Sequence, residues 1–181
     1  PVPENVALGV AQGWTDNPAD DHRLNSTWPA IEHSIYERVL GAHSTIVFAN
    51  SRRLAERMTA ALNEIHEQRG HAGTEIARSH HGSVSKEQRL QVEGDLKEGV
   101  LRCVVATGTL ELGIDMGAVD QIIQIDAPPS VASGLQRIGR AGHQVGEAST
   151  AIFYPAHRAS LVESAAVAEH IRSRSIEAIA P

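Results

Sequence analysis

Two arginines three residues apart are the feature of this sequence best suited to chemistry. Arg137 and Arg140 lie in the stretch QRIGRAGH, which spans residues 136–143. Residues at i, i+3 and i, i+4 share a helix face, so Gln136, Arg137 and Arg140 are predicted to face one target. Gly139 leaves the helix surface bare beside them, and guanidinium groups bind phosphoryl oxygens through paired N–H donors. An arginine placed against a transferring phosphoryl group accelerates transfer by roughly 10³–10⁵-fold.

The loop that would hold such a phosphate is missing from the sequence. There is no GxxxxGKS or GxxxxGKT stretch, and no hydrophobic strand followed by an acidic pair that would hold Mg²⁺. Spacing alone favours a different interpretation of the arginines, as surface residues paired with local carboxylates. If they do act on a phosphoryl group, the phosphate loop is expected on another domain, and this chain is half of an ATPase.

Alternating strands and helices are predicted to position these residues. Short apolar segments predict five strands, at STIVFAN, TEIARSHH, VLRCVVAT, DQIIQID and STAIFYP. Amphipathic patterns predict helices at WPAIEHSIYERVLGA, RRLAERMTAALNEIHEQ and SKEQRLQVEGDLKEG. A helix at PSVASGLQRIGRAG is predicted to begin at Pro129–Ser130 and to end at Gly142. The last predicted helix covers residues 157–175. Its inward-facing residues are expected to be Leu161, Ala165, Ala168 and Ile171.

This alternation predicts an α/β fold, with a parallel β-sheet and helices on both faces. Residues 1–27 read as a linker or entry segment that includes a candidate strand at VALGV. Residues 28–155 read as the domain itself, and residues 156–181 as a final helix leading to further domains. The chain has 181 residues, 41% of them hydrophobic and only 3% aromatic, so Ile, Val, Leu and Ala are expected to fill its core.

Composition excludes several classes of protein. The net charge of −6 argues against a uniformly basic nucleic-acid clamp, although local contacts to phosphates act within a Debye length of about 8 Å. A single cysteine, Cys103, excludes a disulfide framework and a cysteine zinc site and indicates a reducing compartment, the cytoplasm. No apolar run reaches the roughly 20 residues that a membrane span needs. The ten histidines are scattered, and no metal site is predicted.

Polar and small residues follow the first three predicted strands, where parallel sheets bind their ligands. They are Asn50, Ser51 and Arg52, then His80, His81, Gly82 and Ser83, then Thr107, Gly108 and Thr109. Such donors, together with helix N-terminal amides, suit the oxygens of a phosphodiester backbone. Each of Asn50, Ser51 and Ser85 is, taken alone, better explained as a helix N-cap. Three such loops at one sheet edge favour a track for nucleic acid.

An acidic residue follows the third of these loops. Asp115 comes just after Gly113 and Ile114. A carboxylate at this position is able to hold sugar hydroxyls, as carboxylates do in nucleotide sites. The alternative is a loop aspartate that stabilises a turn, and position alone favours that alternative.

Placed in order, these segments resemble the second RecA-like domain of a superfamily 2 helicase, and in particular the Lhr (large helicase-related) family. The resemblance rests on STIVFANSRRLAERM, ARSHHGSVSKEQR and LRCVVATGTLELGIDMGAVDQIIQIDAPPSVASGLQRIGRAGHQVGE, and it covers residues 44 to about 147. The segment PPSVASGLQRIGRAGHQVGE favours Lhr over DEAD-box or RecQ-like relatives. The resemblance implies a RecA-like parallel sheet with helices on both faces.

The resemblance also implies a strand-binding set of residues. The motif at Phe48–Arg52 implies backbone contacts from Asn50, Ser51 and Arg52. The next motif implies them from His81 and Gly82, with Arg89 on the following helix. Thr107 and Gly108 are implied to contact a phosphate, although Gly108 and Thr109 stand where Lhr relatives often carry a serine pair.

The remaining motifs are implied to bind ATP. Gly113 and Asp115 would approach the ribose. Gln136, Arg137 and Arg140 would face the triphosphate as catalytic residues, with Arg140 as the arginine finger. His143 stands where DEAD-box proteins end this motif in arginine, so no DEAD-box role is carried over to it.

The function implied is that of a 3′-to-5′ helicase or translocase on single-stranded DNA that unwinds DNA or RNA:DNA duplexes. ATP and Mg²⁺ would be held mainly by the first RecA-like domain of the same polypeptide, so the isolated chain is expected to hydrolyse no ATP. Two alternatives remain. One is the C-terminal domain of a DEAD-box-like RNA helicase, against which His143 and PPSVASGLQ weigh. The other is a non-catalytic nucleic-acid-binding module whose arginines contact only the backbone.

Overall fold

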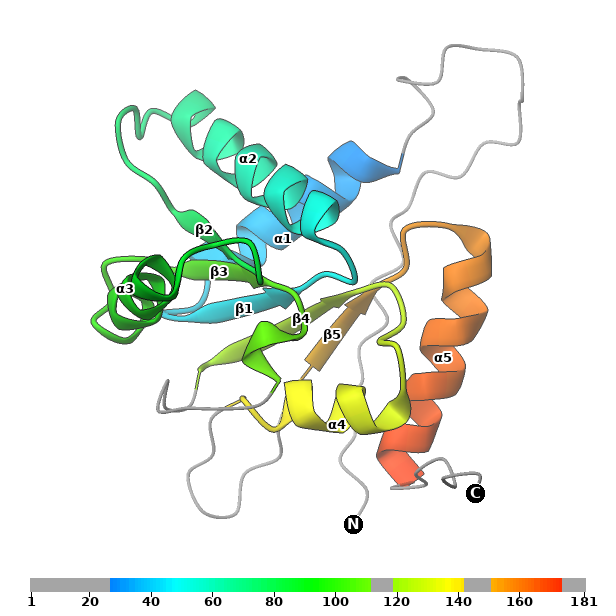
Figure 1. Ribbon diagram of the computed structural model, residues 1–181. Coiled ribbons are helices and arrows are strands. Elements are labelled where there is room, and N and C mark those ends of the chain that lie inside the picture. The colour runs from blue at the N-terminus through cyan, green and yellow to red at the C-terminus, as the bar shows by residue number, and fades with distance from the viewer. Residues whose placement is uncertain (1–26, 112–118, 142–150, 174–181) are drawn as a thin grey trace.

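A five-stranded parallel sheet forms the centre of the computed structural model, which describes residues 27–111, 119–141 and 151–173. The strands are β1 (Thr45–Phe48), β2 (Ala77–His80), β3 (Cys103–Ala106), β4 (Gln121–Ile125) and β5 (Ala151–Tyr154). Their order across the sheet is β2-β3-β1-β4-β5, and every neighbouring pair is parallel (Figure 1). The predicted α/β fold and all five predicted strands are confirmed. The candidate strand at VALGV lies outside the described residues.

Helices cover both faces of this sheet. They are α1 (Trp28–Leu40), α2 (Arg52–Gln68), α3 (Lys86–Lys97), α4 (Val131–Ile138) and α5 (Arg158–Ser173), with a short 3₁₀ helix, η1 (Gly108–Leu110), after β3. Apolar residues of α1 and α2 pack on one face, and those of α3 and α5 pack on the other (Figure 1). Because the strands are parallel, the loops that follow them all meet at one edge, called here the carboxyl edge.

Local sequence explains where the helices begin. Ser51 and Ser130 precede α2 and α4, and each side chain accepts a hydrogen bond from a backbone N–H of the first turn. Ser85 is an N-cap of α3, as the sequence predicted, and it forms a capping box with Gln88. These caps stabilise helix ends that lie at the carboxyl edge, so they fix the loops on which the candidate site is built.

Helix α4 is shorter than predicted, which changes the geometry of the arginine motif. The sequence pattern predicts a helix that continues to Gly142, whereas α4 ends at Ile138 with Gly139 as its C-cap. Beyond it the chain pairs with a neighbouring segment, because Val119 N–H donates to the carbonyl of Arg140 at 3.1 Å and Val119 forms a parallel bridge with Ala141. This pairing takes residues 139–141 out of the helix.

The inward face of α5 also differs from the prediction. Its buried residues are Ser160, Ser164 and Ala168, whereas Leu161 is 38% exposed. Ala165 is exposed as well, so the prediction is wrong for these two residues, confirmed for Ala168 and met only partly by Ile171, which is half-buried. Gly134 of α4 lets α5 approach closely, since a Cβ on Gly134 would lie 2.6 Å from Ile171 Cδ1.

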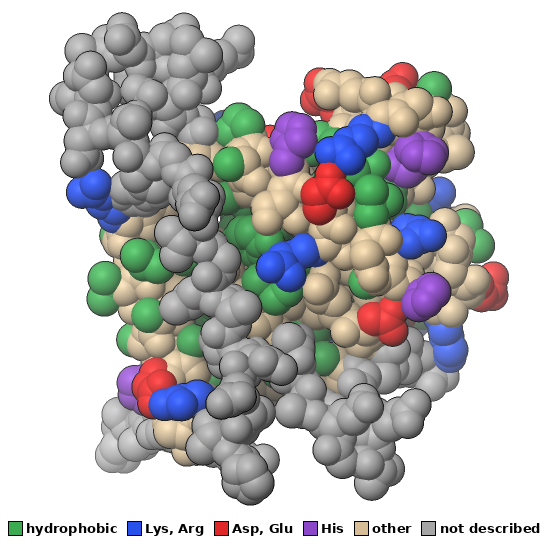
Figure 2. Space-filling view, turned by 180° about the vertical axis from the view of Figure 1, so that it is seen from behind, with side chains coloured by type: hydrophobic (Ala, Val, Ile, Leu, Met, Phe, Trp, Pro, Cys, Tyr) green, Lys and Arg blue, Asp and Glu red, His purple; other side chains and the backbone are tan. Residues whose placement is uncertain are grey.

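Charge is mixed on the visible surface. On the face shown in Figure 2, Lys and Arg side chains are separated by acidic, hydrophobic and uncharged ones. This distribution agrees with the net charge of −6 and favours local phosphate contacts over a continuous basic surface. None of the helices in the described part of the chain combines the length and the apolar character that crossing a membrane requires.

Candidate functional site

Arg137 is the centre of a buried polar cluster at the carboxyl edge. Its side chain is only 3% exposed, although it belongs to the last turn of α4. Its Nε and Nη2 both donate to one carboxylate oxygen of Glu111, at 2.8 and 2.6 Å. Hydrogen bonds between charged groups are roughly twice as strong as neutral ones. The side chain therefore points into the molecule and is held there.

Two side-chain amides complete the surroundings of this guanidinium. Arg137 Nη1 donates to Asn50 Oδ1 at 3.1 Å and to Gln124 Oε1 at 2.8 Å. The guanidinium carbon also lies 5.0 Å from the centre of the Phe48 ring, within the range of a cation–π contact. A buried charge is tolerated only when it is paired and hydrogen-bonded, and these contacts meet that requirement. Arg137 thereby links β1, β4 and the loop after β3.

The predicted common face does not hold for Gln136. Gln136 is exposed and Arg137 is buried, although they are neighbours on α4. Arg140 lies beyond the helix end, in a turn in which its N–H donates to the carbonyl of Arg137 at 3.1 Å. The alternative of an arginine paired with a local carboxylate is correct for Arg137, except that the pair is buried instead of solvated.

Arg140 lies on the other side of the same acidic residue. Its side chain is half-buried, and its Nη2 donates to the main-chain carbonyl of Glu111 at 2.9 Å. Gly139, beside it, is exposed and caps α4. Glu111 thus contacts both arginines of the motif, one through its carboxylate and the other through its backbone.

The loop after β3 begins with the predicted phosphate-contacting residues. Thr107 is half-buried and precedes η1, and its N–H donates to the carbonyl of His80 at 3.1 Å. Gly108, the first residue of η1, is exposed. A Cβ at Gly108 would lie 3.2 Å from Glu111 Oε1, a tight contact, so glycine lets the carboxylate approach the backbone closely.

His80 fixes the opposite side of η1. Its Nδ1 lies 2.8 Å from the hydroxyl of Thr109, and its Nε2 lies 2.9 Å from Glu93. Burial lowers the pKa of His80, and the nearby Glu93 opposes this effect only in part. The Thr109 hydroxyl donates its one proton to the carbonyl of His80 at 3.0 Å. Thr109, which departs from the family pattern, thus has a defined partner.

The loop after β2 carries the predicted pair His81 and Gly82. His81 is buried and lies 3.1 Å from Glu56 of α2, whereas Gly82 is exposed. Arg52 at the start of α2 donates to the Ser83 hydroxyl at 2.7 Å. The loops after β1 and β2 are therefore joined at the carboxyl edge, as the sequence predicted for a common track.

The N-cap alternatives are settled residue by residue. Ser51 and Ser85 are N-caps. Asn50 bonds elsewhere: its Nδ2 donates to the carbonyl of Ala127 at 2.6 Å while its Oδ1 accepts from Arg137. Arg89 is half-buried in the first turns of α3, near the same edge.

Three predicted positions lie outside the described residues. They are Gly113, Asp115 and His143. Their predicted roles stay predictions, as do the roles of the other residues in strand and ATP binding. No group of three or more potential metal-ligating side chains occurs within residues 27–111, 119–141 and 151–173.

Sequence reasoning missed three residues that build this site. Glu111 and Gln124 hold Arg137, and Asp126 adopts a left-handed backbone at φ 58° directly after β4. The Asp126 carboxylate accepts from the N–H of Ala156 at 2.8 Å, which fixes the turn that leads to α4. A glutamine inside the apolar strand QIIQI and a lone glutamate in TGTLELGID were the available signals.

The chain matches a known protein family over most of the described region. Residues 30–144 match the family described as "Helicase conserved C-terminal domain". A protein of Mycolicibacterium smegmatis named "Lhr helicase/probable uracil glycosylase" is 52% identical over 86% of this chain. The Escherichia coli "Lhr helicase/uracil glycosylase" is 50% identical over 90% of it. The chain spans only 12% of the length of each.

A solved structure shares both fold and sequence. The structure described as Mycobacterium smegmatis helicase Lhr bound to ssDNA and AMP-PNP superposes with a TM-score of 0.82 and 57% identity. The match covers 92% of this chain and 21% of the other. The similarity is therefore not confined to the arginine motif, and it includes the arrangement of the strands and helices around that motif.

Proposed function

Because the chain belongs to the helicase conserved C-terminal domain family, as the RecA-like domain of an Lhr-type superfamily 2 helicase, we propose that it is the second motor domain of an ATP-dependent 3′-to-5′ DNA helicase. In ATP hydrolysis, this domain supplies Arg140 to a triphosphate bound by the first RecA-like domain of the same polypeptide. In translocation along DNA, this domain holds the backbone of one DNA strand. The whole protein's activity is part of this proposal, since the chain spans 12% of its relatives.

The observation that carries the proposal is the contrast between the two arginines. Arg137 is engaged in buried contacts to Glu111, Asn50 and Gln124, whereas Arg140 is half-buried at the end of α4. A guanidinium that is only 3% exposed is poorly placed to reach a separate domain, whereas the half-buried Arg140, although it bonds the Glu111 carbonyl, keeps part of its side chain accessible. Arg140 is therefore the better candidate for the finger, with Arg137 as its support.

In the proposed reaction, ATP and Mg²⁺ are bound mainly by the first domain, and Mg²⁺ neutralises charge on the phosphates. This chain closes on the nucleotide and presents Arg140 to the γ-phosphate. A guanidinium in a water-poor site stabilises the charge that develops during phosphoryl transfer. Gly113 and Asp115 are proposed to contact the ribose, and Gln136 to lie at the rim of the site.

The strand track is proposed to follow the same carboxyl edge. Donors there come from the loops after β1, β2 and β3. The proposed residues are Asn50, Ser51, Arg52, His81, Gly82, Arg89, Thr107 and Gly108. Buried His81 and internally bonded Asn50 are proposed to act through their backbone or by shaping the loops, because their side chains already have partners. The related Lhr structure is described as bound to ssDNA, which supports DNA as the strand.

The first test measures ATP hydrolysis by this chain alone and by the longer protein. The chain alone is expected to show no hydrolysis above background with or without single-stranded DNA, because it lacks a phosphate loop. Robust turnover by the isolated chain would refute the assignment of the nucleotide to another domain.

The second test concerns the strand. Thr107→Ala in the longer protein is expected to weaken single-stranded DNA binding by about 0.5–1.5 kcal/mol, the usual contribution of one hydrogen bond. Hydrolysis without DNA should persist in this variant, while its stimulation by DNA requires a higher DNA concentration. Unchanged DNA binding would remove Thr107 from the track.

A further inference from the structure

We propose that Glu111 is a positioning residue that holds both arginines of the motif and the strand-contacting loop in one arrangement. The inference rests on the proposed function, and it assigns a role to a residue that the sequence motifs did not single out. Glu111 is not assigned any contact with ATP. It acts through Arg137 and Arg140.

The carboxylate of Glu111 gathers three donors on one oxygen. Arg137 Nε and Nη2 donate to Oε1 at 2.8 and 2.6 Å, and the Ser133 hydroxyl donates to it at 2.7 Å. The Glu111 side chain is 17% exposed. Ser133 and Arg137 both belong to α4, one turn apart. The carboxylate therefore sets both the place and the rotation of that helix relative to the loop after β3.

The backbone of Glu111 supplies the second half of the arrangement. Its carbonyl accepts from Arg140 Nη2 at 2.9 Å, and its N–H donates to the carbonyl of Gly108 at 3.1 Å. One residue is thus bonded to the buried arginine, to the proposed finger and to η1. A shift of η1 moves the carbonyl that holds Arg140.

The other side of η1 is held independently, so it behaves as a short rigid piece. The Thr109 hydroxyl lies 3.0 Å from the carbonyl of His80 and 2.8 Å from its Nδ1. Thr107, the residue proposed to contact the strand, directly precedes η1, and Glu111 directly follows it. Strand contact at one end and arginine contact at the other are separated by a single helical turn. This geometry suits the transmission of a positional shift from the bound DNA strand, through η1, to Arg140.

The experiment uses the longer protein with Glu111→Gln, which keeps the size of the side chain and removes its charge. A residue that positions the finger acts in the transition state, so kcat for DNA-stimulated hydrolysis should fall on the order of 10²-fold. KM for ATP and Kd for single-stranded DNA should each change by less than about threefold. Glu67→Gln, an exposed carboxylate of α2, is the matched control and should leave kcat unchanged.

Two results would overturn the inference. One is a kcat within about twofold of the unsubstituted protein. The other is a loss of DNA binding as large as the loss of kcat, which would make Glu111 a purely structural residue. If Arg140→Ala abolishes hydrolysis while Glu111→Gln does not impair it, this inference fails and the proposed function stands. If the Arg140→Ala variant of the longer protein hydrolyses ATP normally, the proposed function itself fails.

A second variant tests the route through Arg137. Glu111→Gln leaves a buried cation without its anion, Arg137→Gln does the reverse, and the double variant contains neither charge. If Glu111 acts through Arg137, the kcat of the double variant should be no lower than that of the worse single variant. If the losses in kcat of the two single variants multiply in the double variant, Glu111 does not act through Arg137. Ser133→Ala, which removes one donor to the same oxygen, should lower kcat in the same direction by less.

Discussion

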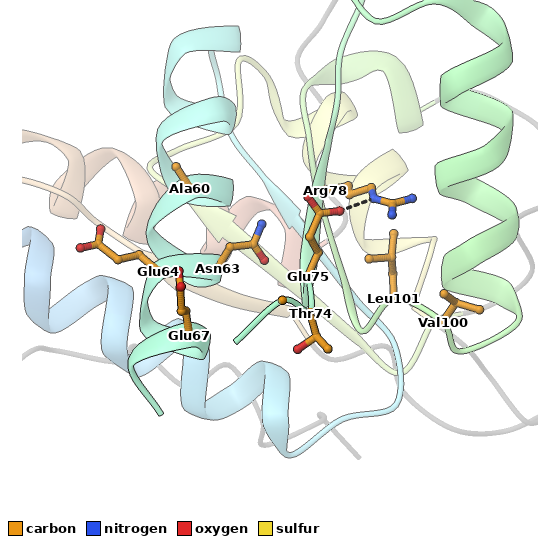
Figure 3. A pocket seen from close by; sticks show the side chains of 10 residues that line it. Ala60, Asn63, Glu64, Glu67, Thr74, Glu75, Arg78, Val100 and Leu101 are labelled. Carbon is orange, nitrogen blue, oxygen red and sulfur yellow. Dashed lines mark hydrogen bonds and ion pairs between the residues drawn. The ribbon is translucent and has the colours of Figure 1, made fainter. Parts of the chain in front are cut away.

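Arg137 and Arg78 make the same kind of ion pair in opposite surroundings. At the carboxyl edge, Arg137 and Glu111 are 3% and 17% exposed and pair at 2.6 Å. On β2, at the rim of a pocket of about 860 Å³, Arg78 bonds Glu75 at 2.8 Å and Asp95 at 2.6 Å while its side chain is 36% exposed (Figure 3). The distances are alike, whereas Arg137 is far less accessible to water and bonds two amides in addition to its carboxylate.

The pocket also shows what a solvated acidic surface looks like in this fold. Glu64 and Glu67 of α2 lie across from Thr74 and Glu75, and Val100, 64% exposed, lies next to Leu101 on the far side (Figure 3). Water stabilises charges here whether or not they are paired, so each pair contributes little. At the carboxyl edge water is largely excluded, and the loss of one partner leaves the other charge uncompensated. Burial, more than distance, should decide which pair matters.

The largest effect is expected from breaking the buried pair. Arg137→Met should lower the free energy of unfolding of the chain by about 3–5 kcal/mol, because the Glu111 carboxylate is left without its cation in a site that largely excludes water. Urea unfolding of the chain followed by circular dichroism measures this change. A loss below about 1 kcal/mol would mean that the buried pair behaves like a surface pair.

A smaller loss is expected from removing one neutral partner of the same guanidinium. Gln124→Leu should lower the free energy of unfolding by about 1–3 kcal/mol, because it leaves an N–H of Arg137 buried without that acceptor. Gln121→Leu on the same strand is the control, since the Gln121 Oε1 is buried and has no hydrogen-bond partner. Equal losses in the two variants would contradict a specific role for Gln124.

The histidine that holds η1 should make stability depend on pH. Burial lowers the pKa of His80 below its ordinary 6.5, so between the two pKa values the unfolded chain binds more protons than the folded one. The contribution is present above pH 6.5 and is lost as pH falls toward the folded pKa, with a slope of at most about 1.4 kcal/mol per pH unit. Glu93 and Arg89 face the ring with opposite effects on its pKa.

Urea unfolding at about pH 7.5 and about pH 5.5 measures this dependence. His80→Gln should flatten it, leaving the contribution of His66, whose pKa burial lowers as well. A dependence unchanged by His80→Gln would show that His80 titrates alike in the folded and unfolded chain.

The smallest effect is expected at Arg78, whose side chain is more exposed than that of Arg137. Arg78→Met should change the free energy of unfolding by about 0–1 kcal/mol, and added salt should reduce the difference further. The comparison with Arg137→Met is direct, since both substitutions remove a guanidinium bonded to a carboxylate. A loss at Arg78 as large as that at Arg137 would mean that burial does not decide how much these pairs contribute.

Regular elements were predictable from the sequence because their signals are local. The strands at STIVFAN and VLRCVVAT are short apolar runs between turn residues, and the Ser85 capping box marks the start of α3 by itself. The end of α4 was not predictable, because it depends on pairing between Arg140 and Val119, which are distant in sequence. The face of α5 was mistaken since small serines, and not Leu161, fit against the neighbouring elements.

The candidate site was predictable as a location and not as a set of contacts. The loops after parallel strands must meet at one edge, so the gathering of Arg52, Thr107 and the arginine motif followed from the alternation of elements. The partner of Arg137 did not follow, because Glu111 lies 26 residues away in the sequence and only the closed sheet brings the two together. Spacing within a helix says which residues share a face, but it does not say whether that face is buried.

The central claim is that Arg140 acts on a triphosphate held by another domain. Its most direct test is the rate of ATP hydrolysis by the longer protein carrying Arg140→Ala, with single-stranded DNA binding measured on the same preparation. We predict that kcat falls by about 10³-fold or more while DNA binding is retained. Normal hydrolysis combined with loss of DNA binding would contradict the claim and would assign Arg140 to the strand track.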